Sequence, residues 1–149
     1  MKEMKTTAQV LVDCLEAEGV DVMFGIPGEE TLDLMFAIRD SKIRFIPVRH
    51  EQGAAFMADV YGRLTGRAGV CLSTLGPGAT NLVTGVADAY LDGAPLVAIT
   101  GQVGTDRCPE VTIIYKRASV CPMKAADALL IIYSATPPPT GRGSTPQAC

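Results

Sequence analysis

Residues 43–55 read IRFIPVRHEQGAA, and this stretch decides the fold that we predict. The apolar run Ile43–Val48 predicts a buried strand, and the run from Glu51 to Leu64 predicts a helix. Glu51 therefore stands at a strand-to-helix turn. In open α/β sheets, ligands bind at this edge, outside the carboxyl ends of the strands. The stretch thus predicts a carboxylate at a ligand-binding edge.

The same alternation of short apolar strands and helices continues on both sides of this stretch. Before it we expect a helix capped by Thr6 or Thr7 and ended by Gly19, a strand over Val20–Phe24, a loop over Gly25–Gly28 and a helix from Glu29. After it we expect a strand over Gly69–Thr74, a loop over Gly76–Gly78, a helix over Ala79–Leu91 and a strand over Leu96–Thr100. This pattern predicts an α/β fold, a truncated, doubly wound parallel sheet (Rossmann-like) with helices on both faces.

The composition changes near Arg107. Residues 1–107 carry a net charge of −5 and residues 108–149 one of +2, and the second part holds six of the ten prolines. We therefore predict a domain over 1–107 and a divergent, proline-rich tail over 108–149. In this tail, Val111–Tyr115 fits a strand and Ala125–Tyr133 fits either a helix or a strand. The segment Thr136–Cys149 is expected to be disordered.

Charge and composition exclude several function classes. The net charge of −3 gives no basic footprint for nucleic acid or an anionic membrane, and no apolar run approaches a membrane span. The polar start of the chain lacks the apolar core of a signal peptide, so we expect a cytoplasmic protein. The five cysteines are scattered without a C-x-x-C pair, which favours reduced thiols over metal ligands.

Two helices are predicted to have small outer faces. At 100° per residue, the large apolar residues of the helix from Glu51 share one side, which we expect to pack on the sheet, while Ala55, Ala58 and Gly62 share the other. In the helix from Ala79 we expect Leu82, Val83, Val86 and Tyr90 on the packing side and Asn81, Thr84, Gly85 and Asp88 on the opposite side. Such faces fit a subunit interface, and equally fit ordinary surface helices rich in Ala and Gly.

The residues at this edge allow more than one role. Burial in a crevice would raise the pKa of Glu51 and the helix N-terminus would lower it, and the sequence does not rank the two. A helix-start acid is the alternative for Glu51, and a structural role is expected for the single histidine, His50. The Gly/Pro loops match no phosphate-binding fingerprint. Gln102 follows the last strand at the same edge as a possible hydrogen-bond donor.

Four motifs in order resemble one known family. They are Gly25-Ile26-Pro27-Gly28, then Arg49 to Ala55 with Ala58 to Arg63, then Gly76-Pro77-Gly78-Ala79-Thr80-Asn81, then Thr100-Gly101-Gln102. Over about residues 4–107 the chain resembles the N-terminal pyrimidine-binding domain of thiamine-diphosphate-dependent enzymes, with the acetolactate synthase (acetohydroxyacid synthase) group the best match. This group implies a transferase or lyase acting on a 2-oxo acid such as pyruvate, within branched-chain amino acid biosynthesis.

The resemblance implies a role for each motif residue. Glu51 would hydrogen-bond a ring nitrogen of the cofactor's aminopyrimidine and so activate the cofactor. Ile26, Pro27, Gly28, Pro77 and Asn81 would line the pyrimidine, Gly76 and Gly78 would shape its loop, and Gln102 would lie on the substrate side. The family binds its cofactor between subunits, which implies a homo-oligomer, a dimer through the helices starting at Glu51 and Ala79.

The departures from the family are equally specific. The family binds the diphosphate through Mg²⁺ in a C-terminal domain, and in some members binds FAD, but no motif of that domain occurs here. The resemblance ends after Thr105-Asp106-Arg107, and Ile26 stands where anabolic members carry an aromatic residue. We therefore expect a fragment with half of a cofactor site. The alternatives are an inactive truncated or frameshifted product, or a nucleotide-binding or regulatory module on a Rossmann-like sheet.

Overall fold

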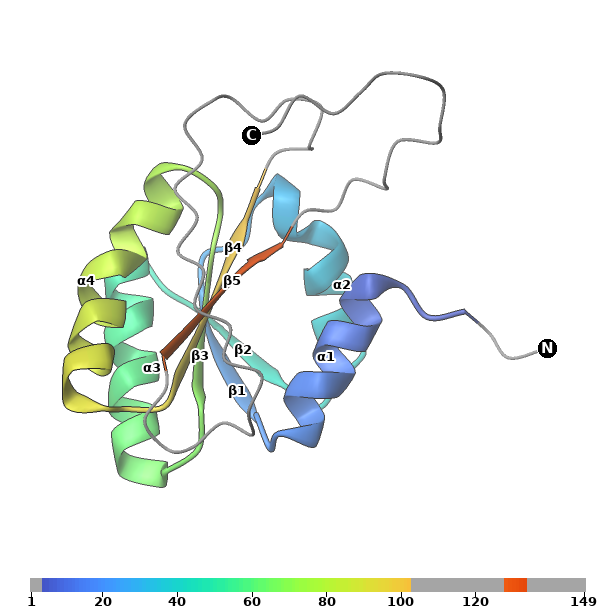
Figure 1. The fold of residues 1–149 in the computed structure, drawn as a ribbon. Helices are drawn as coiled ribbons and strands as arrows, with labels where there is room; N and C mark the ends of the chain where they lie inside the picture. The colour runs from blue at the N-terminus through green and yellow to red at the C-terminus, as the bar shows by residue number, and fades with distance from the viewer. Residues whose placement is uncertain (1–3, 103–127, 134–149) are drawn as a thin grey trace, which may run out of the picture.

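Five parallel strands form one sheet in the part of the chain that the computed structural model describes, residues 4–102 and 128–133 (Figure 1). The strands are β1 (Val22–Gly25), β2 (Arg44–Pro47), β3 (Gly69–Ser73), β4 (Leu96–Gly101) and β5 (Ala128–Tyr133). The helices are α1 (Thr7–Ala17), α2 (Leu32–Arg39), α3 (Glu51–Thr65) and α4 (Pro77–Asp92), with a 3-10 turn η1 (Glu29–Thr31) before α2. The predicted doubly wound α/β fold is confirmed.

The strand order is β2-β1-β3-β4-β5. The chain moves from β1 outward to β2 and then crosses to the other side of β1 to form β3, so the order reverses between β1 and β3. The segment that fitted either a helix or a strand contains β5, which pairs with β4 from Leu96↔Ala128 to Gly101↔Tyr133. The expectations for Val111–Tyr115 and Thr136–Cys149 lie outside the described residues.

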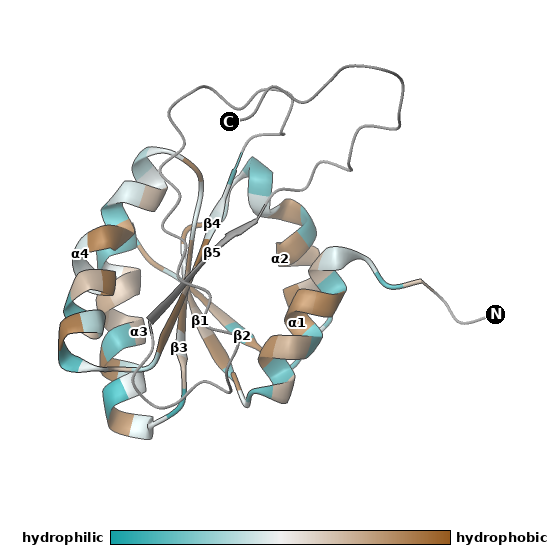
Figure 2. Ribbon diagram, in the orientation of Figure 1, coloured by the Kyte–Doolittle hydropathy of each residue, from teal (hydrophilic) through white to brown (hydrophobic). Residues whose placement is uncertain are grey.

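Each face of the sheet carries its own hydrophobic core. Alternate residues of β1 divide between the faces: Met23 packs under α1 and α2 with Leu34, whereas Phe24 packs under α3 and α4 with Leu82. Figure 1 shows the two helix pairs on opposite sides of the sheet, and Figure 2 shows hydrophobic residues along the strands between them. Burial of both faces explains why β1, β3 and β4 read as continuous apolar runs, whereas β2 at the edge of the sheet is only partly buried.

The predicted orientation of α3 is wrong. Its small residues face inward, with Ala54, Ala55, Ala58 and Gly62 buried, while Met57 and Leu64 are 47% and 81% exposed. The reason is a very close approach to the sheet. A Cβ on Gly69 of β3 would lie 1.9 Å from the carbonyl oxygen of Ala58, so no large side chain fits between this helix and the sheet.

The predicted packing side of α4 is also partly wrong. Leu82 is buried as expected, but Val83 and Tyr90 are exposed, and Gly85, expected on the outer face, is buried. A Cβ on Gly85 would lie 2.5 Å from the Cβ of Ala55. The small faces of α3 and α4 therefore pack against each other within one chain rather than forming an outer surface.

An arginine with three aspartates joins the carboxyl-terminal halves of α3 and α4. Arg63 Nε lies 2.9 Å from Asp59 Oδ1, Arg63 Nη2 lies 2.9 Å from Asp88 Oδ2, and Arg63 Nη1 pairs with Asp92. Asp59 is only 1% exposed, so its charge needs this partner. Hydrogen bonds from Arg63, first to Asp59 and then to Asp92, raise the pKa of the guanidinium.

A second polar cluster joins α3 to the start of β1. The Tyr61 hydroxyl donates to Asp21 Oδ1 at 2.5 Å, and Arg67 Nη2 donates to the Tyr61 hydroxyl at 2.7 Å. The hydrogen bond from Tyr61, followed by the charge of Arg67, lowers the pKa of the Asp21 carboxyl. Because the folded-state pKa is lowered, this contribution to stability is present above the unfolded pKa and is lost as the pH falls through the folded one.

Tyr61→Phe is expected to raise the pKa of Asp21 toward its ordinary value, because the change removes the donor with the largest effect on this carboxyl. An NMR titration of the Asp21 side chain measures the midpoint. Tyr90→Phe, at an exposed tyrosine on α4, serves as the matched control and should leave the midpoint unchanged. An unchanged midpoint in Tyr61→Phe would show that Tyr61 does not set this pKa.

Candidate functional site

The predicted site residues follow the carboxyl ends of four adjacent strands. Residues 26–28 follow β1, Glu51 begins α3 after β2, residues 76–81 follow β3, and Gln102 follows β4. Because all of these strands are parallel, their carboxyl ends meet at one edge of the sheet. The loops after β1 and β3 flank the point where the strand order reverses, which is where open α/β sheets form a ligand crevice.

Glu51 and Asn81 are in direct contact at this edge. Asn81 Nδ2 donates to Glu51 Oε2 at 3.0 Å, which joins the start of α3 to the second turn of α4 across thirty positions of sequence. Both residues are half-buried. Within residues 4–102, Asn81 is the only hydrogen-bond partner of the Glu51 side chain. The amide fixes one oxygen of the carboxylate and leaves Oε1 able to accept a hydrogen bond from a ligand.

Gly28 and Gly78, in the loops after β1 and β3, both lie very close to the side chain of Thr74. A Cβ on Gly28 would lie 2.1 Å from Thr74 Cγ2, and a Cβ on Gly78 would lie 2.6 Å from Thr74 Oγ1 and 3.4 Å from Glu51 Oε1. The lack of a side chain at both positions therefore lets the two loops approach the switch point. Sequence reasoning missed Thr74, although its place at the end of a predicted strand and before Gly76-Pro77-Gly78 is a usable signal.

Other contacts fix the backbone of both loops. The Thr31 hydroxyl donates to the Gly28 carbonyl at 3.0 Å, and the Gly28 amide donates to the same hydroxyl at 3.0 Å. The Ile26 amide donates to the Leu72 carbonyl at 3.2 Å. Gly76 has φ of 59° and ψ of −119°, a conformation that favours glycine. The loop backbones are thus held in place by residues of neighbouring elements.

The remaining predicted residues lie at the same edge in different environments. Ile26 and Gln102 are half-buried, whereas Pro27 and Pro77 are exposed. Pro77 is the first residue of α4, where its missing N–H costs no helical hydrogen bond. The edge therefore combines the carboxylates of Glu51 and Glu30 and the side-chain amides of Asn81 and Gln102 with an apolar rim. This set suits a flat, partly polar ring.

His50 has a structural role in this arrangement. It caps α3, and its Nδ1 accepts a hydrogen bond from the Gln52 amide at 3.2 Å.

No group of three His, Cys, Asp or Glu side chains suited to a metal ion occurs among the described residues. Of the cysteines that the structure describes, Cys14 and Cys71 are free, and burial raises the pKa of the Cys71 thiol to about 12.

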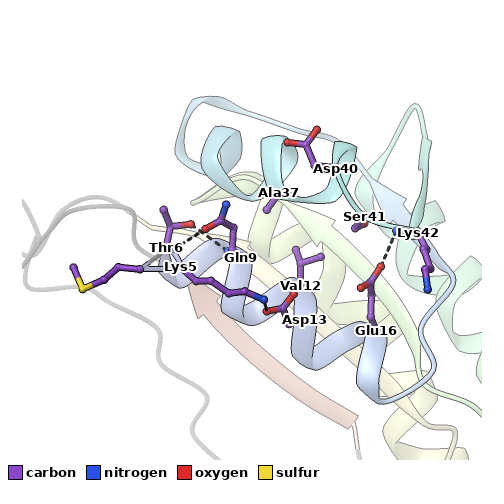
Figure 3. A pocket seen from close by; sticks show the side chains of 11 residues that line it. Lys5, Thr6, Gln9, Val12, Asp13, Glu16, Ala37, Asp40, Ser41 and Lys42 are labelled. Atoms are coloured by element: carbon purple, nitrogen blue, oxygen red, sulfur yellow. Dashed lines mark hydrogen bonds and ion pairs between the residues drawn. The ribbon is translucent and has the colours of Figure 1, made fainter. Parts of the chain in front are cut away.

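A cavity of about 720 Å³ lies elsewhere, between α1 and the end of α2 (Figure 3). Its charged lining residues include Lys5, Asp13, Glu16, Asp40 and Lys42. Lys5 pairs with Asp13, and Glu16 accepts from the Lys42 amide at 2.7 Å, so several of these groups already have partners. None of its lining residues belongs to the loops that hold Glu51 and Asn81.

In the described part of the chain, no helix is long and apolar enough to cross a membrane.

Comparison with known proteins gives one consistent family. Residues 5–119 match the family model described as thiamine pyrophosphate enzyme, N-terminal TPP binding domain. Over 98 residues the chain is 54% identical to a probable acetolactate synthase large subunit of Methanocaldococcus jannaschii, covering 66% of this chain and 17% of that protein. It is 57% identical over 100 residues to an acetolactate synthase of Mycobacterium bovis, covering 66% of this chain and 16% of that protein.

A third relative is the acetolactate synthase isozyme 2 large subunit of Escherichia coli, 50% identical over 112 residues. That match covers 72% of this chain and 20% of the relative. The chain therefore spans a fifth or less of the length of these proteins.

Proposed function

Since this chain belongs to the thiamine pyrophosphate enzyme family through its N-terminal TPP binding domain, we propose that the edge around Glu51 binds the aminopyrimidine end of thiamine diphosphate. In the complete enzyme this half-site would serve a reaction of 2-oxo acids such as pyruvate, resembling that of acetolactate synthase. The observation that carries the proposal is the Glu51–Asn81 contact at the switch point of the sheet.

The chemistry of the donor set fits an aminopyrimidine. A carboxylate accepts a hydrogen bond from a protonated ring nitrogen, and a charge-assisted bond of this kind is stronger than a neutral one. Gly78 supports the fit, because any side chain there would crowd both Thr74 and Glu51 Oε1. Ile26, Pro27 and Pro77 offer apolar contacts to the ring faces, and the backbone turn at Gly76 shapes the loop beside them.

Each residue has a defined task in this proposal. When bound, thiamine diphosphate supplies a thiazolium that stabilises the carbanion formed from a 2-oxo acid. Glu51 accepts the hydrogen bond from the pyrimidine nitrogen and holds a proton at that atom, which is how it activates the cofactor. Asn81 orients the Glu51 carboxylate, and Gln102 lies on the substrate side. We assign the diphosphate and its Mg²⁺, and any FAD, to parts of the enzyme outside this half-site.

Thiamine and thiamine diphosphate are expected to bind this chain with equal affinity, because the proposed contacts involve only the pyrimidine end. The measurement is a titration of the ¹⁵N-labelled chain with each compound, followed at the backbone amides of Gly76 and of residues 78–81. Each titration is run both with and without Mg²⁺ as matched conditions. No shift at these amides with either compound would refute the proposal, and a strong preference for the diphosphate would refute its restriction to the pyrimidine end.

We also propose that two copies associate through α3 and α4. The proposal is supported by the large apolar side chains that these helices expose, now on the side opposite to the one expected from sequence: Met57, Val60, Leu64, Val83, Tyr90 and Leu91. Large exposed apolar side chains gathered on two neighbouring helices commonly mark an interaction site. Assembly of two copies would bring a second chain beside Glu51 and Asn81.

Val60→Asp is expected to shift the chain toward monomer, because it places a charge in this exposed patch. Sedimentation velocity over a range of concentrations measures the change. Val10→Asp, at a 47% exposed valine on α1, is the matched control and should leave association unchanged. Equal sedimentation of the Val60→Asp variant and the unchanged chain would place any interface elsewhere.

A further inference from the structure

The contacts between α3 and α4 follow a constant register. Glu51 meets Asn81, and one turn further along each helix Ala55 meets Gly85. Residues four apart lie on the same helix face, so the functional pair and the small pair belong to one continuous seam. Near the far end of this seam, Arg63 pairs with Asp88 and Asp92 of α4.

The separation of the helices is set at Gly85. A Cβ there would lie 2.5 Å from Ala55 Cβ and 3.0 Å from both Ala55 C and Phe56 N. Two of these three atoms are main chain of α3, so they cannot rotate aside as a flexible side chain does. Carbon atoms in contact ordinarily lie about 3.5–4.0 Å apart, and a methyl group at position 85 would therefore force the helices apart by about 1 Å.

A shift of this size would break the functional contact. The Asn81 Nδ2 to Glu51 Oε2 distance of 3.0 Å would approach about 4 Å, outside hydrogen-bond range. The ion pairs of Arg63 anchor the other end of α4, so separation at Gly85 opens the seam toward Asn81. Neither Glu51 nor Asn81 needs to be altered for their contact to be lost.

We propose that Gly85 is a positioning residue. Because it has no side chain, the backbone of α4 packs directly against the backbone of α3, and this keeps the Asn81 amide in contact with the Glu51 carboxylate. Its effect on the cofactor rests on the function proposed above, whereas its effect on the Glu51–Asn81 contact does not. Gly85 touches neither reacting group, and it acts only through the spacing of the two helices.

The test is the side-chain amide resonance of Asn81 in the ¹⁵N-labelled chain. In the unchanged chain, the donated proton should lie downfield and should respond as Glu51 is titrated, and Glu51→Gln should remove that response. Gly85→Ala is expected to lose both the downfield position and the response. Gly53→Ala, in α3 at a position with no atom within 4 Å of an added Cβ, should keep both.

The double variant Ala55→Gly with Gly85→Ala removes the closest clash, at 2.5 Å, and leaves the two main-chain contacts at 3.0 Å. It is therefore expected to restore part of the downfield position and of the response of the Asn81 amide, which a general loss of stability would not do. If Gly85→Ala does not fold, the double variant should fold and should show this partial recovery. Three results would overturn the proposal. The first is a folded Gly85→Ala chain whose Asn81 amide keeps both the downfield position and the response to Glu51. The second is a double variant that folds but shows neither, and the third is a double variant that does not fold.

A thiamine titration separates this proposal from the proposed function. Gly85→Ala should weaken thiamine binding about tenfold, the cost of about 1.5 kcal/mol for a lost hydrogen bond to a charged group. One outcome separates the two: Gly85→Ala loses the downfield Asn81 resonance as expected, while neither the variants nor the unchanged chain bind thiamine. In that case the positioning role of Gly85 stands and the proposed function fails.

Discussion

Gly69→Ala is expected to destabilise the fold by about 3 kcal/mol, the upper end of the usual cost of overpacking a core. The added methyl group would lie 1.9 Å from the Ala58 carbonyl oxygen, 2.6 Å from its carbonyl carbon and 2.9 Å from its Cα. All three atoms are main chain of α3, so relief requires the whole helix to move off the sheet. Because natural domains have only about 5–15 kcal/mol of stability, this loss is large.

Urea denaturation followed by circular dichroism measures this effect. Gly53→Ala is the matched control, since the same change at a helical position with open space should be neutral or stabilising by up to about 1 kcal/mol. Equal midpoints for Gly69→Ala and the unchanged chain would mean that α3 does not lie as close to β3 as the structure places it.

Glu51→Gln is expected to weaken thiamine binding roughly 10- to 100-fold, the range that follows from about 1.5–3 kcal/mol for a hydrogen bond to a charged group. The amide is nearly the same shape as the carboxylate but cannot hold a proton at the ring nitrogen. Isothermal titration calorimetry or NMR titration measures the affinity.

Glu29→Gln provides the matched control for this change. Glu29 is exposed and follows the loop after β1, so it lies near the same sheet edge without contacting Asn81. Its substitution alters the net charge by the same amount and should leave the affinity unchanged. Equal weakening in both variants would point to a general effect of charge rather than to a specific hydrogen bond.

The first four strands and the loops after them were predictable from sequence. Each of these strands is a short apolar run that contains or adjoins Gly or Pro, and the Gly-Pro-Gly loop at residues 76–78 marks where α4 starts. The strand β5 was not predictable, because its short apolar run fitted a helix equally well. The helix begins at Pro77 rather than at the expected Ala79, because proline suits the first helical position. Likewise β1 begins at Val22 rather than Val20.

The orientation of α3 was not predictable by the rule that large apolar residues face the core. That rule fails where a helix lies so close to the sheet that only Ala and Gly fit. Whether Ala58 meets Gly69, or Gly85 meets Ala55, is decided by tertiary contacts between distant segments. A cluster of small residues on one helix face indicates close packing, but the sequence does not say against what.

The sequence predicted that the candidate residues lie at one edge of the sheet, but it did not predict the contacts between them. Parallel strands place Glu51 and Asn81 at one edge, and the structure joins them by a hydrogen bond. The contribution of Thr74, around which both glycine loops close, depends on distances that no local pattern encodes.

The central claim is that Glu51 hydrogen-bonds the aminopyrimidine ring, and the ¹⁵N resonance of the labelled ring nitrogen tests it most directly. Thiamine labelled at this nitrogen would be bound in turn to the unchanged chain and to the Glu51→Gln variant at saturating concentration. We predict a large change in the ring-nitrogen resonance on binding to the unchanged chain and little change with the variant. The same resonance in both complexes would contradict the account.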